Sequence, residues 1–306
     1  MADQELGPKK APLSKRIAWR FEAFAYDLVS LLLMPFSFRQ ISGFGGWLLR
    51  KIGPLTNKHH IARVGLRTAF PDADEAQINA WLDAQWDNTG RTFAEFPVLH
   101  RLRVFDDNSP ITVTGLEHLE ALKNNGEVSI IVTGHFANWE IMAMVMTQFG
   151  LPVRITYRRI NNPHIDKRVR EKREAYGTKF LVPKSGAAGA RQLLSALKNG
   201  ESVALLNDQK FNQGLSVPFF GVDAMTAPGP TRLALQSNLP ITFLSLTRDK
   251  ATFHMTIHPP VTLEKSGDMA TDIEAGVRRV TDFIEDRIRE TPSQWFWVHR
   301  LSLIHI

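Results

Sequence analysis

Hydrophobic and polar positions change their spacing within one short stretch near the middle of the chain. Residues 128–133 (VSIIVT) form a mostly apolar run rich in β-branched residues, which is typical of a buried strand in a covered sheet. Gly134 interrupts this run, and from about Asn138 the apolar residues recur at helical spacing until Gly150 and Pro152. The pattern therefore predicts a strand, a turn and a helix in direct succession.

Strand-like and helix-like patterns alternate through the later part of the chain. Strands are predicted at 111–113, 153–157, 180–181, 203–206, 241–246 and 252–257, and helices at 116–122, 163–176, 187–198, 230–237 and 273–288. This alternation predicts an α/β fold with a mostly parallel central sheet, helices covering both of its faces and an antiparallel edge. We assign residues 57–306 to this α/β domain, which includes further helices before the first strand.

The N-terminal part of the chain has a different pattern. Residues 1–13 are polar and contain two prolines, so we predict a disordered lead-in. From Ser14 apolar residues fall on one face of a helix, at Ile17, Phe21, Phe24, Leu28, Leu31 and Leu32. Pro35 and Arg39 interrupt the apolar run, which is shorter than the roughly 20 residues that span a bilayer. We predict that residues 14–56 form membrane-associating helices in the headgroup layer, with a helix packed on the protein's own core as the alternative.

Composition and charge limit the kinds of function that the chain can have. Hydrophobic residues make up 43% of the 306 residues and charged residues 22%, which provides enough apolar material for a large core. The chain has no cysteine, which excludes disulfides, thiolate catalysis and cysteine-based zinc sites, and we predict no metal site. The net charge of +6 suits nucleic acid, an anionic membrane or an acidic protein, but no nucleic-acid-binding motif accompanies it. We therefore predict that the partner is a membrane surface or an acidic carrier, and not nucleic acid.

Two polar residues in the strand–turn–helix stretch carry the candidate chemistry. His135 follows Gly134 at the carboxyl end of the predicted strand, where open α/β sheets build their sites. Glu140 lies five residues later, and its side chain can fold back to the imidazole if His135 lies in the turn. A base oriented by a carboxylate is suited to deprotonating a hydroxyl. A histidine that only satisfies a neighbouring carbonyl is the alternative.

Several ordered motifs in this chain resemble those of the bacterial lipid A late acyltransferases, which belong to the wider glycerolipid acyltransferase group. The signature of that group is a histidine and an acidic residue five positions later, and His135 and Glu140 match it. The other motifs are Tyr157-Arg158 with Asn162-Pro163, Asp208-Gln209, the run VPFFG at 217–221 and the run QWFWVHR at 294–300. The resemblance extends over nearly the whole chain, from about Phe21 to Arg300.

The resemblance implies a membrane-associated O-acyltransferase of lipopolysaccharide biosynthesis, acting at the cytoplasmic face of the inner membrane. A fatty acyl chain would pass from the thioester of acyl carrier protein, or of coenzyme A, to a hydroxyl of an anionic lipid A precursor, without a further cofactor. In this reaction His135 would take the proton from the hydroxyl, and Glu140 would fix the imidazole tautomer. The chain has no cysteine and no G-x-S-x-G motif, so we expect direct transfer without an acyl-enzyme.

Residues outside this pair are expected to bind substrate. The resemblance places an essential arginine at Arg173 and a second cation at Arg158, and guanidinium groups are suited to phosphate. A solvated basic helix face is the alternative for these cations. The resemblance also implies a role for Asp208 and its neighbour Gln209, through an arginine or the hydroxyls of an acceptor sugar. Backbone N–H groups at the helix start near Asn138 are expected to hold the oxyanion.

Two other functions are compatible with the sequence. A related enzyme could acylate another lipid, such as lysophosphatidic acid or a mannosylated inositol lipid. A non-catalytic membrane-binding protein of the same fold is the alternative from a different class, although the intact His135 and Glu140 speak against it.

Overall fold

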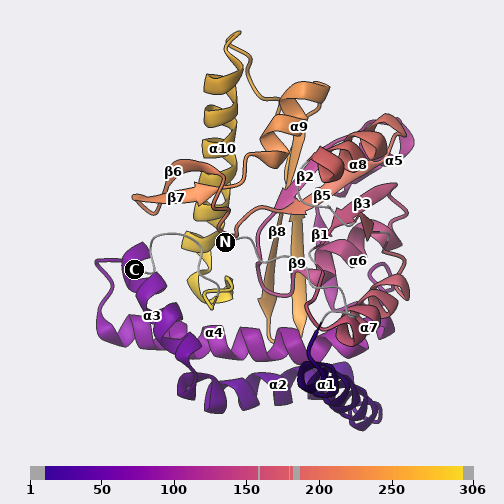
Figure 1. The fold of residues 1–306 in the computed structure, drawn as a ribbon, viewed down its shortest axis with the longest axis vertical. Helices are drawn as coiled ribbons and strands as arrows, with labels where there is room; N and C mark the ends of the chain where they lie inside the picture. Colours follow the sequence, from indigo (N-terminus) through magenta and orange to yellow (C-terminus); the bar gives the residue numbers. More distant parts are fainter. Residues whose placement is uncertain (1–10, 158, 179, 182–186, 299–306) are drawn as a thin grey trace.

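A central sheet of seven strands organises the structure, a computed structural model that describes residues 11–157, 159–178, 180–181 and 187–298 (Figure 1). The order of the strands is β1-β9-β8-β2-β5-β3-β4. The strands are β1 (Ile111–Thr114), β2 (Ile130–Thr133), β3 (Val153–Thr156), β4 (Phe180–Leu181), β5 (Ser202–Leu206), β8 (Ile241–Asp249) and β9 (Thr252–Ile257). Neighbouring strands are parallel except β8 and β9. The predicted mostly parallel sheet is confirmed, but the antiparallel pair does not form the edge, because β1 adds in parallel outside β9.

Helices flank the sheet, as the alternation of patterns predicted. They are α1 (Leu13–Leu32), α2 (Phe38–Ile52), α3 (Asn57–Ala69), α4 (Glu75–Glu95), α5 (Leu116–Asn124), α6 (Glu140–Gln148), α7 (Pro163–Glu174), α8 (Ala187–Lys198), α9 (Gly229–Ser237) and α10 (Met269–Glu290). Short 3-10 turns η1 (Gly53–Leu55), η2 (Phe96–Arg101) and η3 (Pro292–Gln294) connect some of them. Figure 1 shows α4 and α2 lying across one end of the sheet, below the end of β8.

The central strand β2 explains why the sheet is covered on both sides. Its four residues are all buried, and Ile130, Ile131 and Val132 are completely inaccessible to solvent. A strand with apolar side chains on both faces is stable only when helices cover both faces. Its neighbour β5 runs parallel to it, with Thr133 opposite Leu206. The two strands therefore end side by side and release their following loops at the same edge.

A separate two-stranded hairpin, β6 (Leu215–Phe219) and β7 (Val222–Thr226), packs against α10. The sequence marked this region only as the VPFFG motif. Phe220 (φ 51°) and Gly221 (φ 74°) form its turn, and the left-handed conformation of both residues matches the twist of a tight hairpin. The backbone N–H of Phe220 donates to Glu285 of α10 at 2.6 Å, which attaches the turn to the domain.

The N-terminal helix α1 turns its apolar face to solvent. Only Trp19 and Ala23 are buried within it. Exposed apolar side chains on α1 are Leu13, Ile17, Phe21, Phe24, Leu28, Val29, Leu31 and Leu32. This arrangement excludes the alternative in which that face packs on the core of the same chain. Within the described residues, none of the helices combines the length and the apolar character that crossing a bilayer requires.

Two contacts attach the N-terminal helices to the domain. Asn162, which caps α7, donates to the carbonyl oxygen of Trp19 at 2.9 Å, and thus ties α1 to the helix above it. Helix α2 packs on α4 through two glycines, and a Cβ added at Gly45 would lie 2.4 Å from the carbonyl oxygen of Gly90. The backbones of α2 and α4 therefore approach more closely than side chains would allow.

Candidate active site

The register of β2 and β5 brings His135 and Asp208 together. Each residue lies two positions beyond the paired strand ends, Thr133 and Leu206. Because the two strands are adjacent and parallel, their following loops leave the sheet next to each other. The turn from 134 to 139 then leads into α6, which begins at Glu140. We call residues 134–139 the His135 turn.

Asp208 holds the imidazole of His135 with two short contacts. Its Oδ1 lies 2.6 Å from Nδ1 of the ring, and its Oδ2 accepts the backbone N–H of His135 at 2.6 Å. The indole N–H of Trp295 also donates to Oδ2, at 2.8 Å. Burial opposes ionisation of this carboxyl, but the charge of His135 and these hydrogen bonds outweigh it and lower the pKa of Asp208. Asp208 is therefore an ionised carboxylate that accepts a hydrogen bond from Nδ1–H.

The second ring nitrogen of His135 faces the pocket. Gln209 places its side-chain nitrogen 3.5 Å from Nε2, a long contact, and Trp139 packs edge-on with a centroid distance of 4.9 Å. When Nδ1 carries the proton shared with Asp208, Nε2 is the acceptor nitrogen of the neutral imidazole. This tautomer is the one that can remove a proton from a substrate group.

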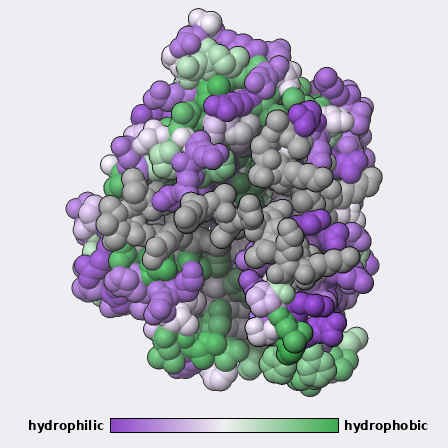
Figure 2. All heavy atoms as spheres, viewed as in Figure 1, coloured by the Kyte–Doolittle hydropathy of each residue, from purple (hydrophilic) through white to green (hydrophobic). Residues whose placement is uncertain are grey.

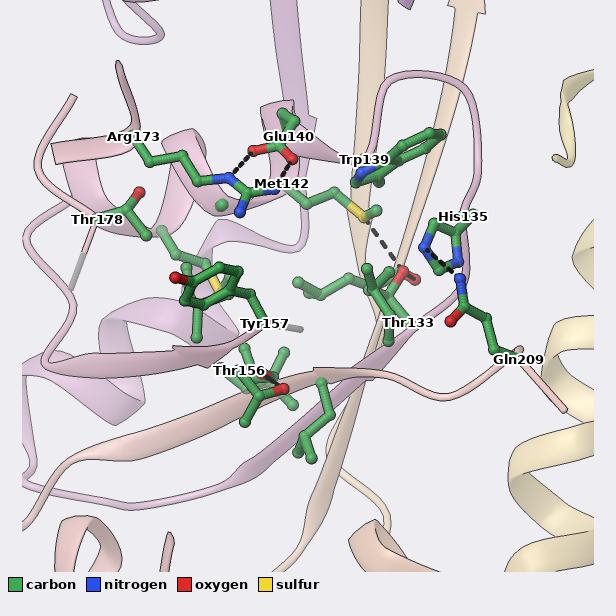
Figure 3. Close-up of a pocket in the computed structure, with 18 of the residues that line it drawn as sticks. Thr133, His135, Trp139, Glu140, Met142, Thr156, Tyr157, Arg173, Thr178 and Gln209 are labelled. Carbon is green, nitrogen blue, oxygen red and sulfur yellow. Dashed lines mark hydrogen bonds and ion pairs between the residues drawn. The ribbon is translucent and has the colours of Figure 1, made fainter. Parts of the chain in front are cut away.

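Glu140 binds other partners than the sequence predicted. Arg173 donates to its carboxylate from Nε at 2.8 Å and from Nη2, and the hydroxyl of Tyr176 donates to it at 2.8 Å. The carboxylate on Nδ1 of His135 is that of Asp208, which corrects the expectation that Glu140 would orient the ring. The reason is local: Glu140 opens α6 and faces α7, whereas the His135 turn approaches β5. Figure 3 shows Glu140 with Arg173 on one side of Trp139 and Met142, and His135 with Gln209 on the other.

Glu140, Arg173 and Tyr176 form a cluster with little exposure to solvent, in which burial and charge shift the pKa values of Arg173 and Tyr176. Burial disfavours the charged guanidinium of Arg173, but the charge and hydrogen bonds of Glu140 outweigh this effect and raise its pKa. Burial, together with the negative charge of Glu140, raises the pKa of Tyr176 well above its usual value. Tyr176 therefore remains a neutral hydrogen-bond donor, and Arg173 remains a cation that balances the charge of Glu140.

A pocket of about 440 Å³ lies between α6 and the sheet, with His135 and Arg173 in its wall (Figure 3). Its apolar lining comes from central strands and from α6, and includes Ile131, Met142, Met146, Ile155, Ala204 and Leu244. Polar side chains in the wall include Tyr157, Glu140 and Gln209. The volume falls in the range of roughly 300–1,000 Å³ that is usual for small-molecule sites. An apolar interior with a base in its wall suits a ligand that has a hydrocarbon part and a reactive polar end.

The other predicted site residues lie in different environments. Asn138 is fully buried; its side chain donates to Glu95 at 2.8 Å and accepts the N–H of Glu140 at 3.3 Å. In the part of the chain that the structure describes, the N–H groups of Ala137, Glu140 and Ile141 already donate to protein acceptors. Those three are therefore not available to hold an oxyanion in this conformation. Arg158 lies outside the described residues.

Sequence reasoning missed four residues that build the site. Trp295 donates to Asp208, Tyr176 donates to Glu140, and the buried pair of Glu95 and Arg248 lies behind the His135 turn. Glu95 and Arg248 carry a usable signal, because each is a charged residue next to apolar runs, in TFAEFPV and ITFLSLTR. Charged residues in such positions are buried only when they are paired.

Sequence comparisons match the chain to a known family of proteins. The profile of a family described as "Bacterial lipid A biosynthesis acyltransferase" matches residues 8–303. A lipid A biosynthesis acyltransferase of Haemophilus influenzae is 25% identical over 92% of this chain and 87% of its own length. The lipid A biosynthesis palmitoleoyltransferase of Escherichia coli is 26% identical over 80% of this chain and 79% of its own length. A phosphatidylinositol mannoside acyltransferase of Mycobacterium tuberculosis is 23% identical over 89% of this chain and 85% of its own length.

Proposed function

Because the chain belongs to the bacterial lipid A biosynthesis acyltransferase family, we propose that it moves a fatty acyl chain from a carrier-protein thioester to a hydroxyl of a lipid A precursor. The observation that carries this proposal is the His135–Asp208 pair in the wall of a pocket with an apolar interior. The pocket accommodates hydrocarbon, and the imidazole provides a base beside it. The names of the relatives support an acyl group as cargo and a glycolipid as acceptor.

The reaction follows from the two nitrogens of His135. Nε2 takes the proton of the acceptor hydroxyl while the hydroxyl oxygen attacks the thioester carbonyl carbon. A new C–O bond forms, the C–S bond breaks, and the imidazolium returns its proton to the departing thiolate. Asp208, on Nδ1, fixes the tautomer and stabilises the imidazolium while it exists. The products are an ester and a free thiol, and no covalent enzyme intermediate is needed.

The Glu140–Arg173 ion pair contributes a cation to the pocket wall. Both oxygens of Glu140 are occupied by Arg173, which is thereby held in the lining of the pocket. We propose that Arg173 pairs with an anionic group of the acceptor, such as a phosphate, while Glu140 keeps the guanidinium in place. In this assignment Glu140 acts through Arg173, and Asp208 takes the orienting role at the histidine.

The pocket lining provides the basis for chain-length selection. Met142 and Met146 of α6 line the pocket from the helix side, and Leu244 of β8 lines it from the sheet side. Methionine side chains are flexible and fill irregular space, so they adapt to a hydrocarbon chain without polar cost. Enlarging or filling this space should shift the preferred acyl length while the chemistry at His135 stays the same.

The donor and the membrane are proposed from charge and exposure. Lys167 of α7 leaves 69% of its side chain exposed on the basic helix, and an acidic carrier protein would be attracted to this helix. Apolar side chains exposed on α1 and α2 include Phe21, Phe24, Phe44 and Trp47. Figure 2 shows hydrophobic surface along the lower edge of the molecule, where Figure 1 places these two helices. Large exposed apolar surfaces of this kind mark interaction sites. We propose that these helices lie in the headgroup layer at the cytoplasmic face of the inner membrane.

The function is tested by direct transfer. Purified protein is mixed with acyl carrier protein that carries a labelled fatty acyl thioester and with a lipid A precursor in detergent micelles. We expect labelled ester product and stoichiometric thiol release. His135→Ala should lose at least about 10²-fold in rate, the scale of general-base assistance. His254→Ala, which changes an exposed histidine of β9, serves as the matched control and should keep the wild-type rate.

Two further arms separate the alternatives. Coenzyme A thioester replaces the carrier-protein thioester in one arm, and phosphatidylinositol mannoside replaces the lipid A precursor in the other, since one relative is named for that acceptor. Faster transfer to the mannoside than to the lipid A precursor would change the proposed acceptor to a mannosylated inositol lipid. Absence of His135-dependent transfer in every arm would contradict the enzyme function and favour a membrane-binding protein.

Membrane association is tested separately by flotation with vesicles of phosphatidylglycerol and phosphatidylethanolamine. A Phe21→Ser/Phe24→Ser variant should float poorly because it loses two exposed apolar side chains of α1. Met269→Ser removes an exposed apolar side chain at the start of α10 and should float like the wild type. Equal flotation of all three proteins would contradict the proposed role of α1.

A further inference from the structure

A buried ion pair, Glu95 with Arg248, lies directly behind the His135 turn. Glu95 ends α4 and is 0% exposed, and Arg248 in β8 is 9% exposed. The guanidinium donates to both oxygens of the carboxylate, at 3.1 Å to Oε1 and 2.7 Å to Oε2. The desolvation of two charges largely offsets their attraction, so a buried pair of this kind is weak evidence for a role in stability. Its other hydrogen bonds point to a role in the active site.

One branch of hydrogen bonds leads from Glu95 to the end of the His135 turn. The side chain of Asn138 donates to Oε2 of Glu95 at 2.8 Å, and its own oxygen accepts the N–H of Glu140 at 3.3 Å. Ser42 of α2 donates to Oε1 of Glu95 at 2.6 Å. Glu95 therefore joins an N-terminal helix, α4 and the start of α6 through one carboxylate.

The other branch leads from Arg248 to Asp208. The backbone N–H of Arg248 donates to the side-chain oxygen of Gln294 at 2.8 Å, and the Gln294 side chain donates back to the carbonyl of Arg248 at 3.0 Å. The carbonyl of Gln294 accepts the N–H of Ala137 at 2.8 Å. The next residue, Trp295, donates to Asp208. The branch thus reaches both loops that hold the His135–Asp208 pair.

Ala137 shows what the two branches hold in place. It is completely buried and has a φ of 45°, in the left-handed region that residues other than glycine seldom adopt. Its carbonyl accepts the hydroxyl of Thr92 at 3.0 Å, and Thr92 in turn accepts from Arg248 at 3.4 Å. Such conformations persist only where the surroundings over-determine them, and they cluster at functional sites.

We infer that Glu95 and Arg248, acting through Thr92, are positioning residues that hold the left-handed turn at Ala137 and thereby keep His135 against Asp208. The effect of this positioning on catalysis rests on the function proposed above. The pair lies behind the turn and makes its contacts with protein groups, so its effect is on the rate of the chemical step rather than on substrate affinity. Loosening the pair lets Ala137 relax toward a right-handed conformation, and this change in the backbone displaces His135, two residues earlier in the same turn.

The central experiment uses Thr92→Val, which removes one hydroxyl at nearly constant volume. We expect kcat for carrier-protein thioester transfer to fall about tenfold with KM unchanged, because small displacements of a catalytic group are costly. The Nδ1–H proton resonance of His135, identified by its loss in His135→Ala, should shift away from its wild-type position. Thr242→Val removes an equally buried hydroxyl that contacts Ser129, near the start of β2, and should change neither quantity.

A second substitution tests the backbone directly. Glycine adopts the left-handed conformation without strain, so Ala137→Gly in the Thr92→Val background should recover about threefold or more of the lost kcat. The recovery should come with a return of the His135 proton resonance toward its wild-type position. A loss in Thr92→Val that Ala137→Gly leaves unchanged would overturn the assignment of Ala137 as the point that the pair holds.

Arg248→Lys tests the ion pair itself, because lysine keeps the charge but loses the planar fork. We expect kcat to fall about 10²-fold with KM unchanged. Arg154→Lys, at the half-buried pair with Glu201, is the control and should retain wild-type kinetics. If Thr92→Val and Arg248→Lys both keep kcat within about twofold of wild type, the inference fails.

The proton resonance separates failure of this inference from failure of the proposed function. Wild-type protein without any transfer activity would contradict the function, yet the resonance in Thr92→Val would still report whether His135 moves. An unchanged resonance in that variant would overturn the positioning role whether or not transfer occurs.

Discussion

Asp208 and Glu140 are both buried carboxylates of the same site, but their partners differ. Asp208 is bonded to an imidazole that can gain a proton, whereas Glu140 is bonded to a guanidinium that is always charged. The charge of Glu140 is already balanced by Arg173, so it has less to offer a cation that forms during the reaction. The charge of Asp208 lies against the imidazole, and in the proposed reaction it would stabilise the imidazolium that forms. The hydrogen-bond partner of each carboxylate, and not the carboxylate itself, therefore decides that Asp208 rather than Glu140 orients His135.

The largest expected effect is that of Asp208→Asn on the rate. An amide nitrogen opposite Nδ1 donates a hydrogen bond, which places the ring proton on Nε2 and removes the acceptor that the hydroxyl needs. We expect kcat for acyl transfer to fall roughly 10²–10⁴-fold, the range of general-base assistance. Asp223→Asn, on the exposed side of β7, should leave kcat unchanged. A near-normal rate in Asp208→Asn, with complete loss in Glu140→Gln, would return the orienting role to Glu140.

Glu140→Gln should affect stability more than Asp208→Asn does. It removes the carboxylate of a largely buried ion pair with Arg173, and breaking a buried pair costs about 3–5 kcal/mol of the free energy of unfolding. Urea unfolding measures this loss. The double variant Glu140→Gln/Arg173→Met removes both charges and should regain much of the stability. If Glu140→Gln unfolds at the wild-type urea concentration, the ion pair does not have the role assigned to it.

Tyr176→Phe should produce a smaller loss. It removes one hydrogen bond to a charged group, worth about 1.5–3 kcal/mol of the free energy of unfolding, and leaves the Arg173 contacts in place. Urea unfolding should therefore place this variant between the wild type and Glu140→Gln. A loss equal to that of Glu140→Gln would mean that the hydroxyl and not the guanidinium dominates the cluster.

The smallest expected effects are on the pH dependence of the free energy of unfolding. One lies at the acid end of the pH range and the other at the alkaline end. The folded-state pKa of Asp208 is lowered, so its contribution is present above about pH 3.9, the unfolded value, and is lost as the pH falls toward the folded value. The folded-state pKa of Tyr176 is raised, so its contribution is present below about pH 10 and is lost as the pH rises further. Asp208→Asn should flatten the acid limb only, and Tyr176→Phe the alkaline limb only. Urea unfolding across the pH range checks both, and a variant that changes the opposite limb would contradict the assignment.

The sequence predicts the strands of the sheet and the position of His135 well, because both depend on local patterns. The apolar runs around Val132 and Leu205 appear as strands with only small differences at their ends. The sequence does not say that these two strands are neighbours, since pairing is decided by the packing of the whole sheet. If the pairing of these two strands were known, the contact between His135 and Asp208 could have been predicted, because each residue lies the same number of positions beyond its paired strand end.

The orientation of α1 shows the opposite case. The helical spacing of Phe21, Phe24 and Leu28 predicted an apolar face, and the structure shows that this face is exposed. Periodicity cannot say what covers such a face, because the same spacing serves a core, a partner or a lipid surface. The hairpin of β6 and β7 escaped prediction for another reason. Its turn uses Phe220 in a left-handed conformation, and no turn-forming residue type marks that position.

The close crossing of Gly45 and Gly90 gives the apolar helices a geometric role. Two helices without side chains between them cannot slide or tilt independently without a backbone clash, so α2 carries α4 with it. Helix α4 ends at Glu95, which is hydrogen-bonded directly to Asn138 in the His135 turn. Binding of α2 to a membrane surface would therefore fix the distance and the orientation of His135 relative to that surface. If the proposed function holds, the search for an acceptor would then be confined to the plane of that surface, with the orientation of His135 toward it already set.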